Sequence, residues 1–191
     1  MGDPVSDAAY WEQRYREGSD RWDLGAPTPV LVDLLDSPQA PARGRTAFPG
    51  SGGGHDLRYW IDRGYDAVGF DFAIQPEGLP VESLDVFELG SRYPDAFDVI
   101  VEYTCYCAID PARREEYARS LRGALKPGGM LVALLFPVGE REGGPPFAVA
   151  ESEIEDVLGP GLRIEHKETP ASSAEGREGR ERLVLYRAPR I

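Results

Sequence analysis

Four glycines within residues 50–54, and an aspartate about 20 residues later, are the residues best placed to do chemistry. The glycines follow a short apolar segment and precede a segment with helical spacing. Glycines at such a point let the backbone approach a ligand closely, and a helix N-terminus offers free N–H groups to a carboxylate or phosphate. The aspartate, Asp71, ends a second apolar segment, where a carboxylate suits the two hydroxyl groups of a ribose. Together these residues predict a site for a ligand that carries a nucleoside.

The spacing of the glycines narrows the choice of ligand. The dinucleotide fingerprint is G-x-G-x-x-G, but the sixth residue counted from Gly50 is His55. The third glycine of that fingerprint serves close packing of helix on strand, where an imidazole would fit poorly. An NAD(P)-dependent oxidoreductase is therefore the weaker alternative. S-adenosylmethionine (SAM) carries one nucleoside and no pyrophosphate. Its amino-acid end would face the glycines and its ribose would face Asp71.

Methyl transfer from a sulfonium is an in-line displacement, which needs alignment of the reactants and exclusion of water. A soft nucleophile such as a thiolate or halide needs little or no general base, and neither of the two histidines of the chain is an obvious base. Tyr103, Tyr106 and Phe136 end predicted central strands and could surround the sulfonium with aromatic faces. Cys105 and Cys107 with two scattered histidines make a poor zinc set, so we expect no metal.

Alternating strand and helix patterns must position these residues. Apolar segments predict strands over residues 46–48, 67–72, 81–87, 97–103 and 130–136. Helical spacing of apolar residues predicts helices over residues 10–16, 29–35, 55–63, 111–125 and 151–158. This alternation predicts an α/β fold with a mostly parallel central sheet and helices on both faces. Two last strands, 163–169 and 181–188, have no helix between them and predict an antiparallel pair at one edge.

Length and charge limit the classes of partner. A chain of 191 residues is long enough for one well-packed domain, and we expect a single domain over 1–191. The net charge of −12 disfavours nucleic acid and anionic membranes, so we expect a small-molecule substrate and a monomer or weak homodimer. Two cysteines make no disulfide framework and the sequence has no signal-peptide pattern, so a cytoplasmic location is expected.

A set of short motifs runs in order along most of the chain. The segments are residues 22–25, 28–29, 49–56, 69–71, 97–100, 102–104, 107–109, 125–129, 136–137 and 143–147. As a set they resemble class I SAM-dependent methyltransferases, and more narrowly the thiopurine S-methyltransferase family with its thiol and halide methyltransferase branch. The resemblance implies a Rossmann-like core over residues 44–191. It also implies methyl transfer from SAM to a small soft nucleophile, a thiol, a thiopurine-like compound or a halide, with S-adenosylhomocysteine as the product.

The resemblance also assigns roles to the N-terminal aromatic residues. In the family this segment folds over the cofactor, so residues 1–36 would form a lid in which Trp11, Tyr15 and Trp22 wall the cofactor. Tyr15 stands where relatives often have a second tryptophan. Tyr103 would lie near the reactive end and is the catalytic candidate, as well as a cofactor contact.

Further cofactor contacts follow from the same resemblance. Gly50 and Gly52 would approach the methionine part of SAM, and Asp71 would bind its ribose. Asp85 stands where an acid meets the adenine amino group, with the Val86 backbone alongside.

One departure from the family pattern concerns the segment between Asp71 and Asp85. Relatives usually place a helix after the ribose acid, but the residues available here are too few for an ordinary crossover helix, so we expect that helix to be missing. Eight extended residues reach roughly 26 Å, which allows the return without a helix. The missing helix motivates an alternative hypothesis for the function. The protein would then bind SAM or S-adenosylhomocysteine with the same fold but with little or no turnover.

Overall fold

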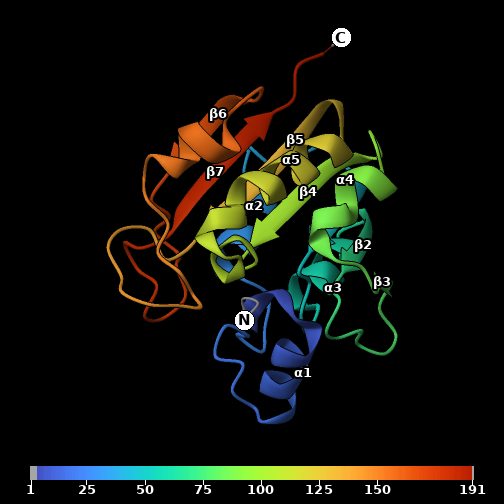
Figure 1. Ribbon diagram of the computed structural model, residues 1–191. Coiled ribbons are helices and arrows are strands. Elements are labelled where there is room, and N and C mark those ends of the chain that lie inside the picture. Colours follow the sequence, from blue (N-terminus) through green and yellow to red (C-terminus); the bar gives the residue numbers. More distant parts are fainter. Residues whose placement is uncertain (1–3, 191) are drawn as a thin grey trace.

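A seven-stranded sheet forms the centre of the computed structural model, which describes residues 4–190 (Figure 1). The strands lie in the order β3-β2-β1-β4-β5-β7-β6. Their bounds are β1 Arg45–Pro49, β2 Asp66–Phe70, β3 Val81–Glu82, β4 Phe97–Tyr103, β5 Leu125–Leu135, β6 Arg163–Glu168 and β7 Arg182–Arg187. The neighbours from β3 to β5 pair in parallel, whereas β7 pairs antiparallel with both β5 and β6. The predicted mixed sheet with an antiparallel C-terminal pair is therefore confirmed.

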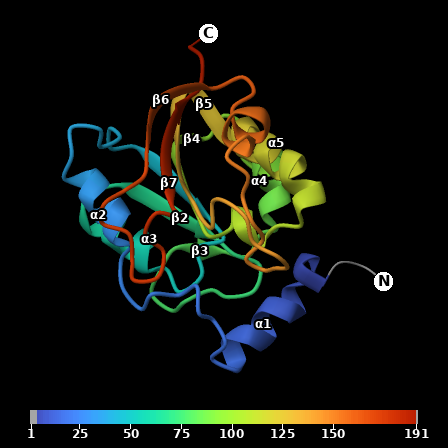
Figure 2. The same ribbon diagram turned by 90° about the vertical axis from the view of Figure 1, so that its left-hand side faces the viewer.

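Helices cover both faces of this sheet, as Figure 2 shows. Their bounds are α1 Ala8–Arg16, α2 Pro29–Leu35, α3 His55–Asp62, α4 Leu89–Arg92 and α5 Arg114–Ala124, with a π-helical turn at Ile154–Leu158. Short 3-10 turns lie at Pro4–Ser6, Val86–Glu88, Tyr106–Ala108 and Pro111–Arg113. One face carries α2 and α3, and the other carries α4 and α5.

The strands of the sheet supply two separate cores because successive side chains of a strand point to opposite faces. Ile100 and Leu131 pack with Tyr117 and Leu121 of α5 in one core. Val99, Val101 and Val132 belong to the other core, with residues of α2 and α3 such as Leu31 and Trp60. Burial on both faces explains why β4 and the second half of β5 are almost continuously apolar in sequence.

Two predicted elements differ from the structure. The predicted strand 81–87 ends after two residues, because the side chain of Asp85 accepts a hydrogen bond from the N–H of Phe87 (3.0 Å) and starts a 3-10 turn. The predicted helix 151–158 is a turn followed by the five-residue π-helical segment. The other predicted strands and helices are present, with ends shifted by a few residues.

The connection between β2 and β3 contains no helix, as expected; all of it lies within the described residues. Leu79, in this connection, packs over the glycine-rich loop, and a Cβ on Gly54 would clash with its side chain. One leucine and Pro76 therefore cover part of the sheet face where a crossover helix is expected from the resemblance.

The N-terminal segment lies at the edge of the sheet toward which the parallel strands run. Figures 1 and 2 show α1 below that edge, whereas α2 lies against a face of the sheet. Val30, Leu31 and Leu34 of α2 are buried in the core. The predicted lid of residues 1–36 therefore divides, because α2 belongs to the core and, of the described residues before it, 4–28 lie at the edge. No helix within residues 4–190 is long and apolar enough to cross a membrane.

Candidate active site

The glycine-rich loop, residues 50–54, leaves β1 at the carboxyl edge and leads into α3. Gly50, Gly52 and Gly54 have φ values of +64°, +52° and +75°, which side-chain-bearing residues rarely adopt. The N–H of Gly50 donates to the carbonyl of Phe70 (2.7 Å), which fixes the loop to the end of β2. A Cβ on Gly50 would lie 2.8 Å from the Cβ and the Sγ of Cys105. Glycine at position 50 is therefore required by both backbone conformation and space.

Asp71 joins this loop to the end of β2. Its Oδ2 accepts the N–H of Gly52 (3.0 Å), and its Oδ1 accepts the N–H groups of Ala73 (2.9 Å) and Ile74 (3.1 Å). Burial raises the pKa of Asp71, while these three backbone donors act in the opposite direction. The predicted ribose acid and the glycine loop thus lie in contact, as their sequence positions suggested.

A cavity of about 470 Å³, the large cavity, opens at this edge of the sheet. The predicted residues that line it are Trp11, Tyr15, Trp22, Gly50, Asp71, Asp85 and Val86. They come from the N-terminal segment and from the ends of three parallel strands, so the fold brings these seven together around one space. Gly52 and Tyr103 lie instead on a smaller adjoining cavity, the small cavity, with a volume of about 70 Å³.

The N-terminal aromatic residues pack edge to face with one another. The Trp22 ring lies 5.4 Å from that of Trp11 and 5.6 Å from that of Tyr15, measured between ring centroids. The indole N–H of Trp11 donates to the carbonyl of Val5 (2.9 Å), and that of Trp22 donates to the Tyr15 hydroxyl (3.4 Å). Burial raises the pKa of Tyr15, so its hydroxyl stays protonated. The three rings form one wall of the large cavity, and their contact with a cofactor stays a prediction.

Asp85 and Val86 follow β3 and line the same cavity. Oδ1 of Asp85 caps the turn that begins at Val86, whereas Oδ2 receives no hydrogen bond from the residues that the structure describes. That oxygen is free to accept from an amino group. The Val86 carbonyl accepts the hydroxyl of Ser120 (2.8 Å), which fixes the backbone at this point.

Tyr103, the catalytic candidate, is engaged by two neighbours. Its hydroxyl donates to Oε1 of Glu181 (2.7 Å) and accepts a hydrogen bond from the guanidinium of Arg177. Burial and the Glu181 charge raise the pKa of Tyr103, so the phenol stays neutral. Tyr103 therefore lines the small cavity as a neutral, hydrogen-bonded group, and its catalytic role stays a prediction.

The large cavity is also lined by residues to which the sequence assigned no cofactor contact. They include Cys107, Phe136, Arg141, Pro145, Pro146 and Arg177. Arg177 comes from the polar loop between β6 and β7, yet it is only 6% exposed. Its guanidinium carbon lies 5.0 Å from the centroid of the Phe136 ring, and Nη2 donates to the Trp22 carbonyl (2.9 Å). The sequence offers the late arginines Arg177, Arg180, Arg182 and Arg187 as candidates to bind an anionic substrate, although a solvated loop and strand face is the prediction that it favours. No periodicity or motif distinguishes Arg177 from the other three, so its burial could not be predicted.

The aromatic pocket suggested by the sequence is present only in part. Phe136 lines the cavity, but Tyr106 is buried in the core with its hydroxyl donating to Glu153 (2.8 Å). Cys105 and Cys107 both line the large cavity. Burial raises the pKa of Cys107 to about 12 and that of Cys105 well above its usual value, so both side chains are neutral thiols.

A buried glutamate supports the turn that carries both cysteines. Glu102 is fully buried, and its carboxylate accepts the N–H of Tyr106 (2.7 Å) and the hydroxyl of Tyr117 (2.6 Å). Burial raises the pKa of Glu102 to about 7. This residue is the acidic member of the motif at 102–104, and it acts beneath the cavity rather than in it. Among residues 4–190, no group of three or more histidine, cysteine or carboxylate side chains could hold a metal ion.

Comparison with known proteins decides the family. The family model described as thiopurine S-methyltransferase (TPMT) matches residues 6–76 and 73–185. The chain belongs to the thiopurine S-methyltransferase family. The match is divided in the connection between β2 and β3, where the crossover helix is missing. Family membership confirms the expectation of a SAM-dependent methyltransferase, with SAM as the cofactor, and the nicotinamide alternative is not retained.

The names of curated relatives in this family describe sulfur-containing methyl acceptors. The chain is 36% identical to thiocyanate methyltransferase 1 of Brassica oleracea, over 93% of this chain and 84% of the relative. It is 36% identical to a probable thiol methyltransferase 2 of Arabidopsis thaliana, over 78% of this chain and 71% of the relative. With the thiopurine S-methyltransferase of Bordetella pertussis the identity is 26%, over 78% and 80% of the two chains.

Solved structures confirm the fold. A 1,6-didemethyltoxoflavin-N1-methyltransferase from Burkholderia thailandensis, crystallised with its substrate and S-adenosylhomocysteine, superposes with a TM-score of 0.77 at 17% identity. The match covers 99% of this chain and 92% of that one. A TehB-like SAM-dependent methyltransferase from Corynebacterium glutamicum gives a TM-score of 0.62 at 20% identity, covering 96% and 98% of the two chains. The Rossmann-like class I methyltransferase fold is therefore confirmed.

Proposed function

We propose that this methyltransferase transfers the methyl group of SAM to a small soft anion, a thiolate, thiocyanate or halide. The observation that supports it is that the lining of the large cavity holds both carboxylates and arginines. We assign an adenosine end to the carboxylates of Asp71 and Asp85, which suit the hydroxyl and amino groups of adenosine. We assign an acceptor end to Arg141 and Arg177 beside Phe136, in a protein whose net charge is −12. Local positive charge offsets the repulsion that the whole protein exerts on a small anion.

The reaction needs alignment rather than acid–base chemistry. A lone pair of the acceptor sulfur or halide forms the new bond to the methyl carbon, and the bond from that carbon to the sulfonium sulfur breaks. The electron pair stays on that sulfur, so S-adenosylhomocysteine leaves as a neutral thioether and no proton moves. The attack of an anion on a cation removes both charges, so a site that excludes water favours it. The neutral Tyr15 hydroxyl and Cys107 thiol, which line the large cavity, are consistent with a reaction that uses no base.

The individual roles follow from position in the cavity. Gly50 and Gly52 would lie against the methionine part of the cofactor and Asp71 against its ribose. Asp85, through its free oxygen, and Val86 would contact the adenine. The aromatic wall of Trp11, Tyr15 and Trp22 would close over the sulfonium, so residues 4–28 would act as the lid of a single domain that spans 1–191. Tyr103 would hold the region beside the reacting sulfur through its hydrogen bonds.

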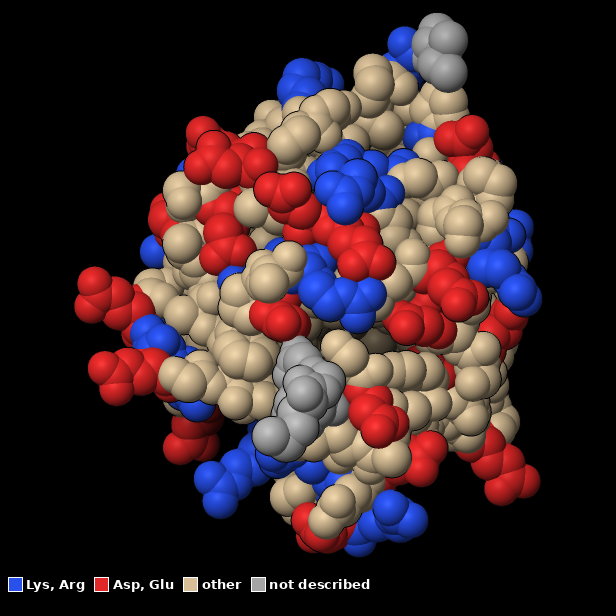
Figure 3. Space-filling model, in the orientation of Figure 1, with Lys and Arg blue, Asp and Glu red and all other residues tan. Residues whose placement is uncertain are grey.

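The proposal includes the cellular setting and the partners of the protein. We infer a small-molecule acceptor, a monomer or weak homodimer, no nucleic-acid or membrane partner, and a cytoplasmic location. Acidic and basic side chains are interspersed over the face shown in Figure 3. The negative net charge also disfavours a phosphate backbone as a partner.

Two measurements test the proposal. Calorimetric titration of the protein with SAM should show binding, and the absence of heat at millimolar cofactor would contradict the first half. Incubation with SAM and iodide, thiocyanate or a small thiol, followed by gas chromatography of the headspace, should show the methylated acceptor. Binding without consumption of SAM by any of these acceptors would instead support a cofactor-binding protein without turnover, the alternative that the short connection after Asp71 suggests.

A further inference from the structure

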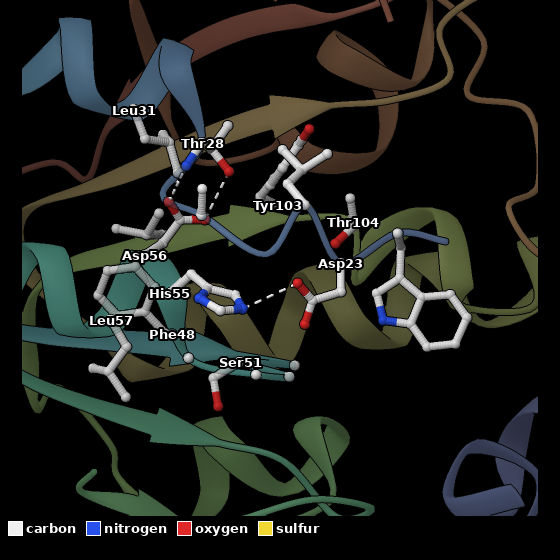
Figure 4. A pocket seen from close by; sticks show the side chains of 18 of the residues that line it. Asp23, Thr28, Leu31, Phe48, Ser51, His55, Asp56, Leu57, Tyr103 and Thr104 are labelled. Carbon is white, nitrogen blue, oxygen red and sulfur yellow. Dashed lines mark hydrogen bonds and ion pairs between the residues drawn. The ribbon is translucent and has the colours of Figure 1, made fainter. Parts of the chain in front are cut away.

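The small cavity beside the glycine loop contains an acid and an imidazole that the assignments above do not use. Asp23 and His55 line it, together with the glycines of residues 50–54. Trp22, Gly50 and Thr104 line both the small and the large cavity, so the two spaces adjoin at the glycine loop. Figure 4 shows the Asp23 carboxylate and the His55 imidazole pointing toward each other within this cavity.

The two oxygens of the Asp23 carboxylate have different surroundings. Oδ1 accepts the N–H of Gly25 (2.7 Å) and lies 3.0 Å from Nε2 of His55. Oδ2 receives no hydrogen bond from any residue between 4 and 190, although only 20% of the side chain is exposed. It lies directly against the glycine loop, because a Cβ on Gly53 would be 2.5 Å from it. One oxygen therefore fixes the carboxylate, and the other is presented to the loop without a protein donor.

The segment that carries Asp23 is held in place by a second contact. Asp56, in the first turn of α3, accepts both the N–H (2.7 Å) and the hydroxyl (2.8 Å) of Thr28. These bonds, drawn in Figure 4, attach the end of the lid segment to the helix that follows the glycine loop. The position of Asp23 over the loop thus does not depend on its contact with His55 alone.

We propose that Asp23, oriented by His55, binds the α-ammonium group of the cofactor's amino-acid tail. This inference rests on the proposed function, which places adenosine at Asp71 and Asp85 and directs the tail past Gly50 toward the small cavity. An ammonium group has three hydrogen-bond donors and no acceptor, so a carboxylate oxygen without a protein donor complements it. The amide hydrogens of the first turn of α3 have no acceptor within the helix and suit the carboxylate of the same tail.

Three adenosine derivatives separate this role from a general effect on cofactor binding. S-adenosylhomocysteine has the complete tail, 5′-(3-carboxypropylthio)adenosine has the carboxylate without the ammonium, and 5′-methylthioadenosine has neither group. In calorimetric titrations, Asp23→Asn should raise the dissociation constant of S-adenosylhomocysteine by about ten- to a hundredfold, which is the effect of one charge-assisted hydrogen bond. The dissociation constants of the two derivatives without an ammonium should change by less than about threefold, since they have nothing to donate to Asp23.

Two further variants complete the experiment. Asp20→Asn removes the same charge three residues earlier, where the carboxylate lines neither cavity, and should leave all three constants unchanged. His55→Gln should weaken S-adenosylhomocysteine less than Asp23→Asn does. The double variant should be no weaker than Asp23→Asn alone, because His55 acts through Asp23.

The possible failures are distinguishable. Asp23 does not bind the ammonium if Asp23→Asn binds S-adenosylhomocysteine as tightly as the unmodified protein does. The same conclusion follows if the substitution raises the dissociation constants of S-adenosylhomocysteine and 5′-methylthioadenosine by the same factor. If the unmodified protein binds none of the three adenosine derivatives, the proposed function itself is wrong.

Discussion

The adenosine end and the acceptor end that we assign to the large cavity are built in different ways. At the adenosine end, Gly50, Asp71 and Asp85 each follow one parallel strand within three residues, and their contacts are mostly to backbone N–H groups. At the acceptor end, Phe136 follows β5, and Arg177 arrives from the loop between β6 and β7. The contacts there join side chains that are far apart in the sequence.

This difference shows which part of the site is set by the backbone and which by side chains. The carboxyl edge of a parallel sheet fixes the adenosine end, so a short motif specifies it. The acceptor end depends on how individual side chains from later loops pack, so it can change while the fold stays the same. Substitutions at the two ends should therefore separate cofactor binding from acceptor binding.

The largest effect is expected at Gly50 of the adenosine end, where the backbone conformation and the neighbouring Cys105 both exclude a side chain. Gly50→Ala combines a left-handed backbone with a Cβ that meets Cys105 at 2.8 Å, and should lower the free energy of unfolding by about 4 kcal/mol. Gly78→Ala is the control, since its φ is +76° but no atom lies within 4 Å of the added Cβ. Urea denaturation compares them, and equal losses would contradict the close approach at Gly50.

The next effect concerns Glu102, which supports the turn between the two ends. Its folded pKa of about 7 lies above that of an exposed glutamate, so the folded protein binds more protons than the unfolded chain between about pH 4.5 and 7. Its contribution to stability is therefore complete at low pH and is lost as the pH rises through this window, by about 3 kcal/mol. Glu102→Gln has no proton to lose at this position. The free energy of unfolding of the variant, minus that of the unmodified protein, should therefore increase as the pH rises from about 4.5 to 7. Urea denaturation at several pH values measures it, and a constant difference would contradict the raised pKa.

Asp71→Asn should affect the adenosine end alone. Loss of a charged acceptor for the ribose should weaken S-adenosylhomocysteine by about 2 kcal/mol, while KM for the acceptor stays within about threefold. Asp66→Asn, at the opposite and exposed end of β2, is the matched control. Calorimetry gives the dissociation constants and steady-state kinetics give KM. An unchanged dissociation constant would remove Asp71 from the cofactor site.

The smallest effect is expected at the acceptor end. Arg177→Gln should raise KM for thiocyanate or iodide about tenfold and leave the dissociation constant of S-adenosylhomocysteine nearly unchanged. Arg182→Gln removes a charge from the start of β7 without lining the cavity, and should leave both constants unaltered. If Arg177→Gln weakens the cofactor instead, the two ends are not separable in the way that their construction suggests.

The sequence predicted those parts of the molecule that depend on local pattern. Strands β1, β2, β4 and β5, helices α3 and α5 and the contact between the glycine loop and Asp71 follow from apolar periodicity and from the carboxyl-edge rule. Helix α4, Leu89–Arg92, was not predicted. The predicted strand 81–87 was wrong beyond Glu82, because the capping side chain of Asp85 outweighed the apolar residues around it. The roles of Tyr103 and Arg177 depend on a contact between residues more than seventy positions apart, for which one sequence holds no local signal.

The connection between β2 and β3 has a consequence for protein engineering. Leu79 packs over Gly54, and β3 pairs with β2 through two residue pairs. The two cores of the central strands lie under α2, α3 and α5. Residues 76–78 follow the N–H groups of Ala73 and Ile74, which hold Asp71, and precede Leu79. These three residues are therefore the natural point at which to graft a helix from a longer homologue, or to circularly permute the chain, while the contacts of Asp71 are kept.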